Sequence, residues 1–123
     1  MLAPCALGSA LNDHTIPRIR ASIVAGAANN QLAEPRHGDD INARGILYAP
    51  DYAINAGGLI NVAAEVTGYD AERSRLRTLK IYDTILEIAE RSSKTLTPTY
   101  RVADLMVEEK LARVPHRPSY PQL

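Results

Sequence analysis

The chain has 123 residues, a formal net charge of +0 at pH 7, and 46% hydrophobic residues. A chain of this length and composition can form one compact domain with a buried core. The balanced charge offers no basic surface to neutralise phosphates, and the aromatic residues are all tyrosines, so we expect no nucleic-acid partner.

The chain contains a single cysteine, Cys5. One cysteine excludes a disulfide framework and a zinc cluster held by several thiolates. No apolar run approaches the roughly 20 residues of a membrane helix, and the first residues lack the pattern of a signal peptide. We therefore expect a cytoplasmic protein with no membrane partner.

Two short apolar runs predict strands. Residues 22–25 end at Gly26, and residues 45–49 end at Pro50. Continuous rather than alternating apolar runs indicate strands of a parallel sheet buried on both faces. Roughly twenty residues separate them, which is enough for a crossover containing a helical piece at residues 39–44.

The segment before the first strand predicts little regular structure. Asn12 or Asp13 caps a short helix that ends near residues 18–20. Nothing before Pro4 is expected to form a strand.

Three helices are predicted after Pro50. The first spans residues 51–66, is interrupted by Gly57-Gly58 and ends at Gly68. The second spans residues 71–92 with Asp70 as its N-cap. Its inward stripe comprises Thr78, Ile81, Tyr82, Ile85, Leu86, Ile88 and Ala89.

The last helix spans residues 97–113. Thr97 is its expected N-cap and Pro98 its first residue, and its expected inward residues are Ala103, Met106, Val107 and Leu111. The proline-rich residues 115–123 are expected to be a flexible tail. The fold class is therefore α/β: residues 1–114 form the closing part of a Rossmann-like nucleotide-binding domain, with about two short parallel strands and a C-terminal helical extension.

Asn29 and Asn30 follow the end of the first predicted strand. Ligands of open α/β sheets bind in the crevice outside the carboxyl ends of the strands, and amides both donate and accept hydrogen bonds without charge. The pair suits a nicotinamide ribose and a substrate carboxylate. The alternative is that the two asparagines only form a turn.

Asn55 is followed by Gly57-Gly58 inside a predicted helix. Each internal glycine costs a helix about 1 kcal/mol relative to alanine, so two in succession require a reason. One reason is the close approach of a ligand. Tight packing of the helix on a strand is the other.

The remaining reactive side chains carry weaker signals. Cys5 has no base assigned to it and is interpreted as a buried or loop-lining thiol. Residues 34–40 contain groups that bind metals, but proline and glycine indicate a solvated loop, so no metal site is predicted. The glycine-rich signature Gly-x-Gly-x-x-Gly of dinucleotide-binding folds does not occur in the chain.

Together these segments resemble the C-terminal part of the Glu/Leu/Phe/Val amino-acid dehydrogenases, most closely the leucine dehydrogenases. The resemblance runs from Ala3 to about Leu111. It rests on residues 3–8 (Ala-Pro-Cys-Ala-Leu-Gly), 26–32 (Gly-Ala-Ala-Asn-Asn-Gln-Leu), 34–38 (Glu-Pro-Arg-His-Gly), 48–62 and 81–85.

The resemblance implies reversible oxidative deamination of L-amino acids to 2-oxo acids and ammonia, with NAD as cofactor. It implies cofactor contacts for Cys5, Ala6, Ala28, Asn29, Asn30 and Asn55, and substrate contacts for Asn30, Gly58, Leu59 and Val62. Aliphatic residues at positions 59 and 62 favour a branched aliphatic side chain such as that of leucine.

The resemblance also implies that the catalytic lysines and aspartate lie outside this chain. Lys80, Lys94 and Lys110 match no catalytic lysine motif. We therefore expect the chain to be inactive by itself. The resemblance also implies that the intact proteins of the family form homo-oligomers. Two alternatives remain open: a non-catalytic interaction module, and one half of a split enzyme.

Overall fold

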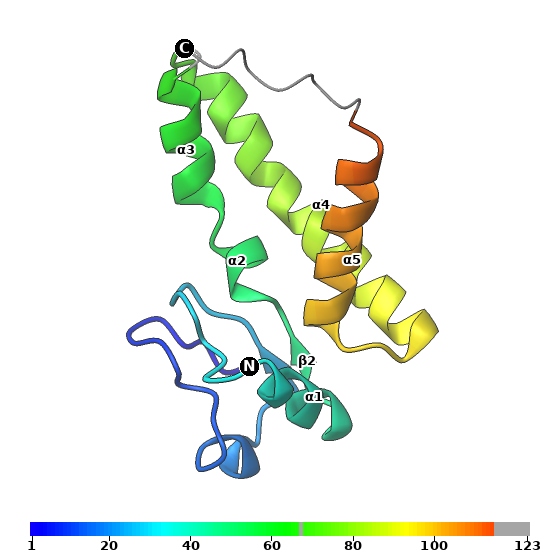
Figure 1. Cartoon of the computed structure of the whole chain (residues 1–123). Helices are drawn as coiled ribbons and strands as arrows, with labels where there is room; N and C mark the ends of the chain where they lie inside the picture. The colour runs from blue at the N-terminus through cyan, green and yellow to red at the C-terminus, as the bar shows by residue number, and fades with distance from the viewer. Residues whose placement is uncertain (67, 115–123) are drawn as a thin grey trace, which may run out of the picture.

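The computed structural model describes residues 1–66 and 68–114, so the predicted tail lies outside the described residues. Its elements, in chain order, are η1 (Ile16–Arg18), β1 (Ile23–Val24), α1 (Arg36–Ala43), β2 (Leu47–Tyr48), α2 (Asp51–Ile54), α3 (Gly57–Val66), α4 (Ala71–Thr95) and α5 (Thr99–Ala112). Figure 1 shows two parts: loops, strands and α1 form one, and α2 leads from it into a layer of helices.

The two predicted strands form a parallel pair, as expected. Ile23 pairs with Leu47 and Val24 with Tyr48. As predicted, no strand forms before Pro4, although Leu2 forms an isolated parallel bridge with Val24. The Leu2 amide donates to the Ile23 carbonyl at 2.8 Å. The edge of a strand presents unpaired backbone groups, so an extended neighbour can pair with it whatever its side chains are.

The first core lies between the strand pair and α1. Its buried members are Leu11, Ile16, Ile19, Val24, Ile41, Ile46 and Tyr48. Burying one such aliphatic side chain contributes about 1.5–3 kcal/mol, so this cluster is the main stabilising unit of the α/β part. The other face of the sheet is less well covered than predicted, since Ile23 and Leu47 each remain 39% exposed.

The long helix α4 begins where the sequence predicts. Asp70 is its N-cap and accepts a hydrogen bond from the Arg73 amide at 3.0 Å. The helix ends at Leu96, whose φ of 56° places it in the left-handed region. None of the helices in the described part of the chain is both long enough and apolar enough to cross a membrane.

The apolar stripe predicted on α4 is only partly buried. Ile88 is 2% exposed and packs in a second core with Val102, Ala103 and Met106. Thr78, Tyr82 and Leu86 are exposed, contrary to the prediction. The reason is that α2, α3 and α5 pack against one side of α4, and the predicted stripe is wider than that side.

The start of α5 differs from the prediction by one position. Pro98, not Thr97, is the N-cap, because its ψ of 139° is extended rather than helical. Ala103 and Met106 are buried as predicted, whereas Val107 and Leu111 are 52% and 66% exposed. Both exposed residues lie beyond the second core.

The predicted helix 51–66 is broken at Asn55 and Ala56 rather than at the two glycines, which form the first turn of α3. A Cβ at Gly57 would lie 3.4 Å from Thr78 Cγ2, an ordinary contact, and a Cβ at Gly58 would meet no atom within 4 Å. Tight packing within the described residues therefore does not explain Gly58.

Gly26 and Gly58 make a matched pair for substitution. A Cβ at Gly26 would overlap the backbone of Pro4, which cannot move aside as a side chain can. We expect Gly26→Ala to lower the free energy of unfolding by about 1–3 kcal/mol. Gly58→Ala should raise it by about 0.4–1 kcal/mol, because alanine restricts the unfolded chain. Urea denaturation, monitored by circular dichroism, measures both changes. Equal effects of the two substitutions would contradict the close approach of the Pro4 backbone to Gly26.

Candidate functional site

The loop that follows β1 is held by one buried side chain. Gln31 is 0% exposed, and its Nε2 donates to the carbonyls of Gly26 at 2.7 Å and Ala28 at 2.9 Å. Asn30 has a φ of 51°, in the left-handed region that asparagine tolerates better than most residues. Gln31 thus closes the loop that presents Asn29 and Asn30.

The start of α2 is held by Tyr48 and Asp51. The Tyr48 hydroxyl donates to Asp51 Oδ1 at 3.1 Å, and the Asp51 amide donates back to that hydroxyl at 3.3 Å. Both residues are buried. Burial, together with the nearby Asp51 carboxylate, raises the pKa of the Tyr48 phenol far above its usual value, so the hydroxyl remains a donor.

Asn55 joins the loop after β1 to the end of α2. Its Nδ2 donates to Asn29 Oδ1 at 2.6 Å and to the Ala27 carbonyl at 3.4 Å. The two segments that the sequence marks separately therefore meet through a direct amide–amide contact. This contact is partly exposed to solvent rather than enclosed in a core.

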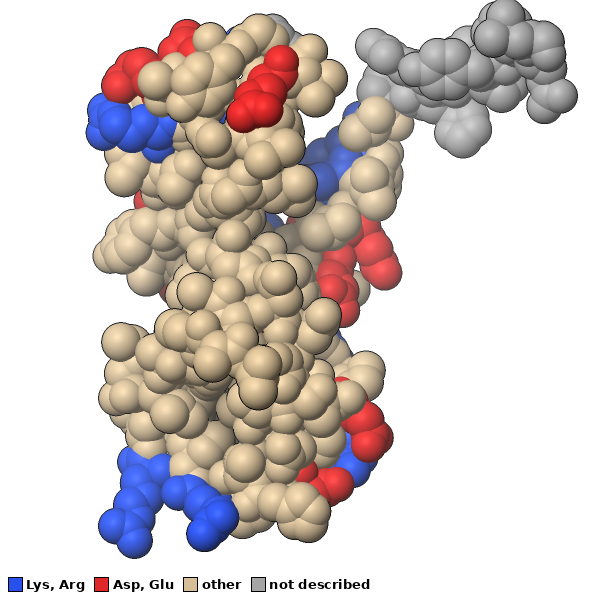
Figure 2. Space-filling model, turned by 90° about the vertical axis from the view of Figure 1, so that its left-hand side faces the viewer, with Lys and Arg blue, Asp and Glu red and all other residues tan. Residues whose placement is uncertain are grey.

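A cleft of about 620 Å³ opens beside this contact. It is lined by Asn29, Asn30, Asp51, Tyr52, Asn55, Ala56, Gly58, Leu59 and Val62. Figure 2 views the molecule from the side that carries α3, and the middle of this face shows no lysine, arginine, aspartate or glutamate. Asp51 is buried and accepts a hydrogen bond from Tyr48, so the cleft offers a ligand mainly amides and apolar side chains.

The structure brings most of the predicted site residues to this cleft, but not all of them. Cys5 and Ala6 lie on the exposed N-terminal loop, and the Cys5 thiol accepts a hydrogen bond from the Ala27 amide at 3.5 Å. Ala28 is 6% exposed. Cys5 and Ala6 are therefore adjacent to the loop after β1 and Ala28 is part of it, but none of the three lines the cleft.

Sequence reasoning missed the residues that hold the cleft in shape. Gln31 stands in the motif as a third amide after Asn29 and Asn30, but spacing alone does not show that it is buried. Asp51 follows Pro50 at a predicted helix start, which is a signal for a capping or pairing role. Tyr52 and Ala56 line the cleft without any sequence signal.

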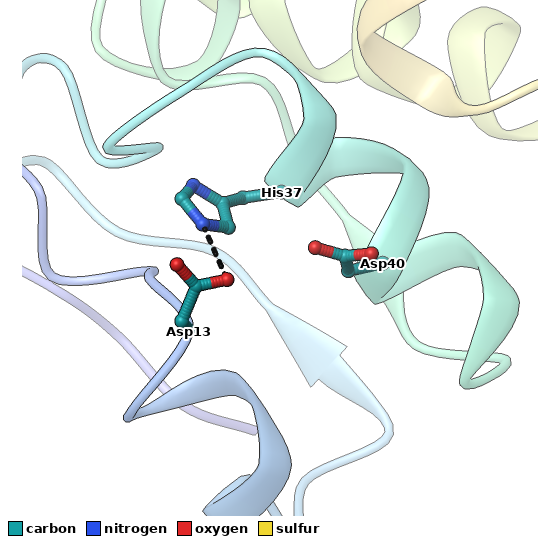
Figure 3. Close-up of side chains that lie close together, drawn as sticks. All are labelled: Asp13, His37 and Asp40. Carbon is teal, nitrogen blue, oxygen red and sulfur yellow. Dashed lines mark hydrogen bonds and ion pairs between the residues drawn. The ribbon is translucent and has the colours of Figure 1, made fainter.

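The segment 34–40 forms helix α1 rather than a solvated loop from residue 36 onward. Asp13, His37 and Asp40 place candidate metal-binding atoms within 4.8 Å of one another, as Figure 3 shows. However, His37 Nδ1 accepts a hydrogen bond from the Glu34 amide at 3.0 Å. A neutral ring then carries its proton on Nε2, which faces Asp13 Oδ1 at 3.4 Å and has no lone pair for a metal.

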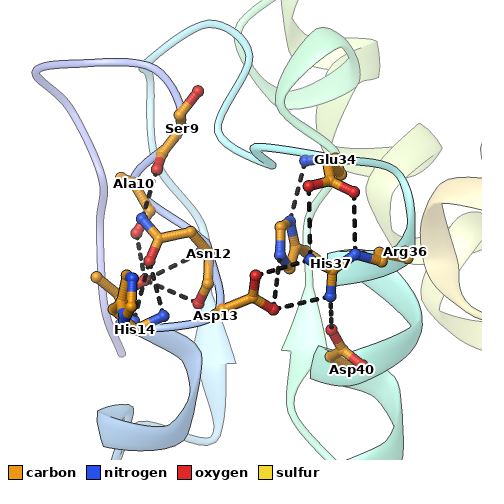
Figure 4. A network of polar contacts seen from close by, with 10 residues as sticks. Ser9, Ala10, Asn12, Asp13, His14, Glu34, Arg36, His37 and Asp40 are labelled. Carbon is orange, nitrogen blue, oxygen red and sulfur yellow. Dashed lines mark hydrogen bonds and ion pairs between the residues drawn. The ribbon is translucent and has the colours of Figure 1, made fainter.

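Arg36 takes the place that a cation would occupy. Its guanidinium donates to both oxygens of Asp13, at 2.8 and 2.7 Å, and to Glu34 at 2.9 Å (Figure 4). The network ties the loop before η1 to the start of α1. Its geometry favours a structural role over a metal site.

This network gives stability a pH dependence that can be measured. Hydrogen bonding to Arg36 lowers the pKa of Asp13 from its usual 3.8 to about 2. A carboxyl whose pKa is lowered by folding stabilises the fold above its unfolded pKa and loses that contribution as pH falls. We expect the melting temperature to decline between about pH 4 and pH 2, and to decline less in Asp13→Asn. An unchanged slope in the variant would contradict the network, and Asp83→Asn is the matched exposed control.

The fold is α/β, and its polar loop lies beside the cleft at the carboxyl end of a parallel strand, the position at which open α/β sheets bind ligands. The model of the Glutamate/Leucine/Phenylalanine/Valine dehydrogenase family matches residues 1–109, and the chain belongs to this family. The resemblance predicted from the sequence is thereby confirmed.

Individual relatives agree with this assignment. The chain is 56% identical to the leucine dehydrogenase of Bacillus cereus over 110 residues, which are 89% of this chain and 30% of that protein. It is 51% identical to the valine dehydrogenase of Streptomyces coelicolor over 116 residues, 94% of this chain and 32% of that protein.

A solved structure gives the same result. The crystal structure of L-tryptophan dehydrogenase from Nostoc punctiforme matches with a TM-score of 0.87 and 49% identity, over 91% of this chain and 34% of that chain. The chain therefore spans about a third of the length of the relatives that it matches.

Proposed function

We propose that the chain forms one wall of the active-site cleft of an NAD-dependent dehydrogenase that converts branched-chain L-amino acids, such as leucine, to 2-oxo acids and ammonia. The observation that carries this proposal is the meeting of Asn29, Asn30 and Asn55 at one cleft beside Leu59 and Val62. In this proposal, residues 1–114 are the closing part of a Rossmann-like domain with its helical extension.

The residues of the cleft fit the nicotinamide end of NAD. Uncharged amides can hydrogen-bond ribose hydroxyls and a carboxamide, and the open space at Gly58 admits a ring. We assign cofactor contacts to Cys5, Ala6, Ala28, Asn29, Asn30 and Asn55. NAD, when bound, supplies the acceptor for the hydride of the amino acid.

The substrate contacts follow from the same lining. Asn30 is proposed to donate to the substrate carboxylate. Leu59 and Val62 are 73% and 57% exposed, and Gly58 leaves room beside them. Their apolar side chains suit a branched aliphatic substrate, whereas a second carboxylate would require a polar partner at this position.

The lysines of the described residues do not reach this cleft. Lys80, Lys94 and Lys110 lie on α4 and α5, and none lines it. Positioned acid–base catalysis is typically worth about 10²–10⁴-fold, so we expect the chain by itself to lack turnover.

An association role is the second candidate, because apolar surface lies beside the N-terminal segment that pairs with β1. A hollow of about 550 Å³ there is lined by Met1, Leu2, Pro4, Ala10, Leu11, Thr15, Arg18, Ile19, Arg20 and Ala21. Apolar surface of this kind favours contact with another protein segment. The chain is then an interaction module or one half of a split enzyme, and assembly into homo-oligomers is compatible with either.

The first test uses the purified chain alone with NAD and leucine, valine or isoleucine. We expect no formation of NADH above the background without protein, because none of the lysines in the described residues lines the cleft. Measurable turnover would contradict the proposal that catalysis needs residues outside this chain. Intact leucine dehydrogenase from Bacillus cereus serves as the positive control.

The second test supplies the part of a relative that this chain does not span. The chain is co-expressed with the portion of Bacillus cereus leucine dehydrogenase that precedes the matched region. Restored leucine-dependent NADH formation supports the split enzyme. In that complex, Asn30→Ala should lower kcat/KM by about 10- to 100-fold through loss of a hydrogen bond to a charged carboxylate. Asn61→Ala, on the same helix as Leu59 but outside the cleft, is the control. A complex that forms but remains inactive would favour the interaction module.

A further inference from the structure

A further hollow lies on the side of α2 opposite the cleft. It has a volume of about 260 Å³ and is floored by α4, with α2 and the start of α3 on one side and α5 on the other (Figure 1). Its apolar lining includes Ala53, Ala56, Ile60, Ile81, Ile88 and Met106. We call this hollow the rear groove.

Three cations line the rear groove, and no acidic residue does. They are Arg77, Lys80 and Lys110. None of them forms an ion pair with another residue in the described part of the chain. Other cations of α4 behave differently: Arg75 pairs with Glu72 at 2.7 Å, and Arg91 pairs with Glu87 at 2.7 Å. The rear groove thus combines an apolar floor with positive charge that the described residues do not balance.

The rear groove and the cleft share a wall. Tyr52 and Ala56 line both of them, and Asn55 lies between these two residues in sequence. The Tyr52 hydroxyl lies 2.9 Å from Asp104 Oδ1, which ties this wall to α5. A molecule in the rear groove therefore contacts the opposite side of the element that presents Asn55.

We propose that the rear groove binds a free aliphatic monocarboxylate. The apolar floor takes the hydrocarbon chain, and Arg77, Lys80 and Lys110 take the carboxylate, which guanidinium and ammonium groups bind by charge-assisted hydrogen bonds. The volume of about 260 Å³ lies just below the usual range of small-molecule sites, which suits a short chain. This site does not depend on the dehydrogenase proposal, since it uses no residue of the cleft other than the shared wall.

Octanoate is the probe, and calorimetry on the chain measures its affinity. We expect saturable binding, about ten- to fifteenfold weaker binding of hexanoate because two methylenes are removed, and weaker binding of octan-1-ol. No saturable binding of octanoate would overturn the proposal. Equal affinity for octan-1-ol or octylammonium would also overturn it, because the cations would then contribute nothing.

Variants separate the groove from the rest of the surface. Lys80→Glu combined with Lys110→Glu should weaken octanoate binding about tenfold, whereas Lys94→Glu, a single charge reversal outside the groove on α4, should leave it unchanged. Val107→Trp should fill the groove and abolish binding, with Leu111→Trp on the same helix as the control. Equal effects of groove and control variants would overturn the assignment.

A measurement on the unaltered chain covers the case in which a variant does not fold. Methyl NMR with octanoate should shift the resonances of Ile60, Ile81 and Val107, which line the groove. Shifts confined to Leu76 and Leu79, on the exposed side of α4, would show that octanoate binds another apolar surface. That result would overturn the proposal. A rear groove that binds a segment of another protein but no octanoate would also overturn it.

Discussion

The hydrogen bonds between Tyr48 and Asp51 fix the direction in which the chain leaves the sheet. Pro50 ends β2, and the Tyr48 hydroxyl then binds both the amide and the carboxylate of the first residue of α2. Because α2 is short, its orientation decides where Asn55 points. The same orientation separates the cleft on one side from the rear groove on the other.

The elements that are determined locally are predictable from the sequence, whereas those that depend on packing are not. Asp70 marks the start of α4 because an N-cap acts within one turn, and continuous apolar runs identify both strands. The bridge of Leu2 and the exposure of Tyr82 depend on what lies beside them in space. The break at Asn55 likewise reflects its contact with Asn29 across the fold.

The candidate site likewise contains features that the local sequence predicts and features that depend on packing. Position at the end of a strand identifies Asn29 and Asn30, and the family resemblance supplies their proposed roles. The contact between Asn29 and Asn55 joins residues that are far apart in sequence, so no local pattern predicts it. Gln31 was missed because its importance comes from burial: its amide satisfies two backbone carbonyls that would otherwise lack partners in the described fold.

The left-handed backbone of Asn30 narrows the chemistry available at that position. Most side chains are strained at a φ of 51°, and the residues that tolerate it best are glycine, asparagine and aspartate. Glycine has no side chain to offer a ligand, and aspartate would place a negative charge beside any bound carboxylate. Backbone geometry and the proposed contact with a carboxylate thus favour the same amino acid independently, which narrows the choice open to protein engineers at residue 30.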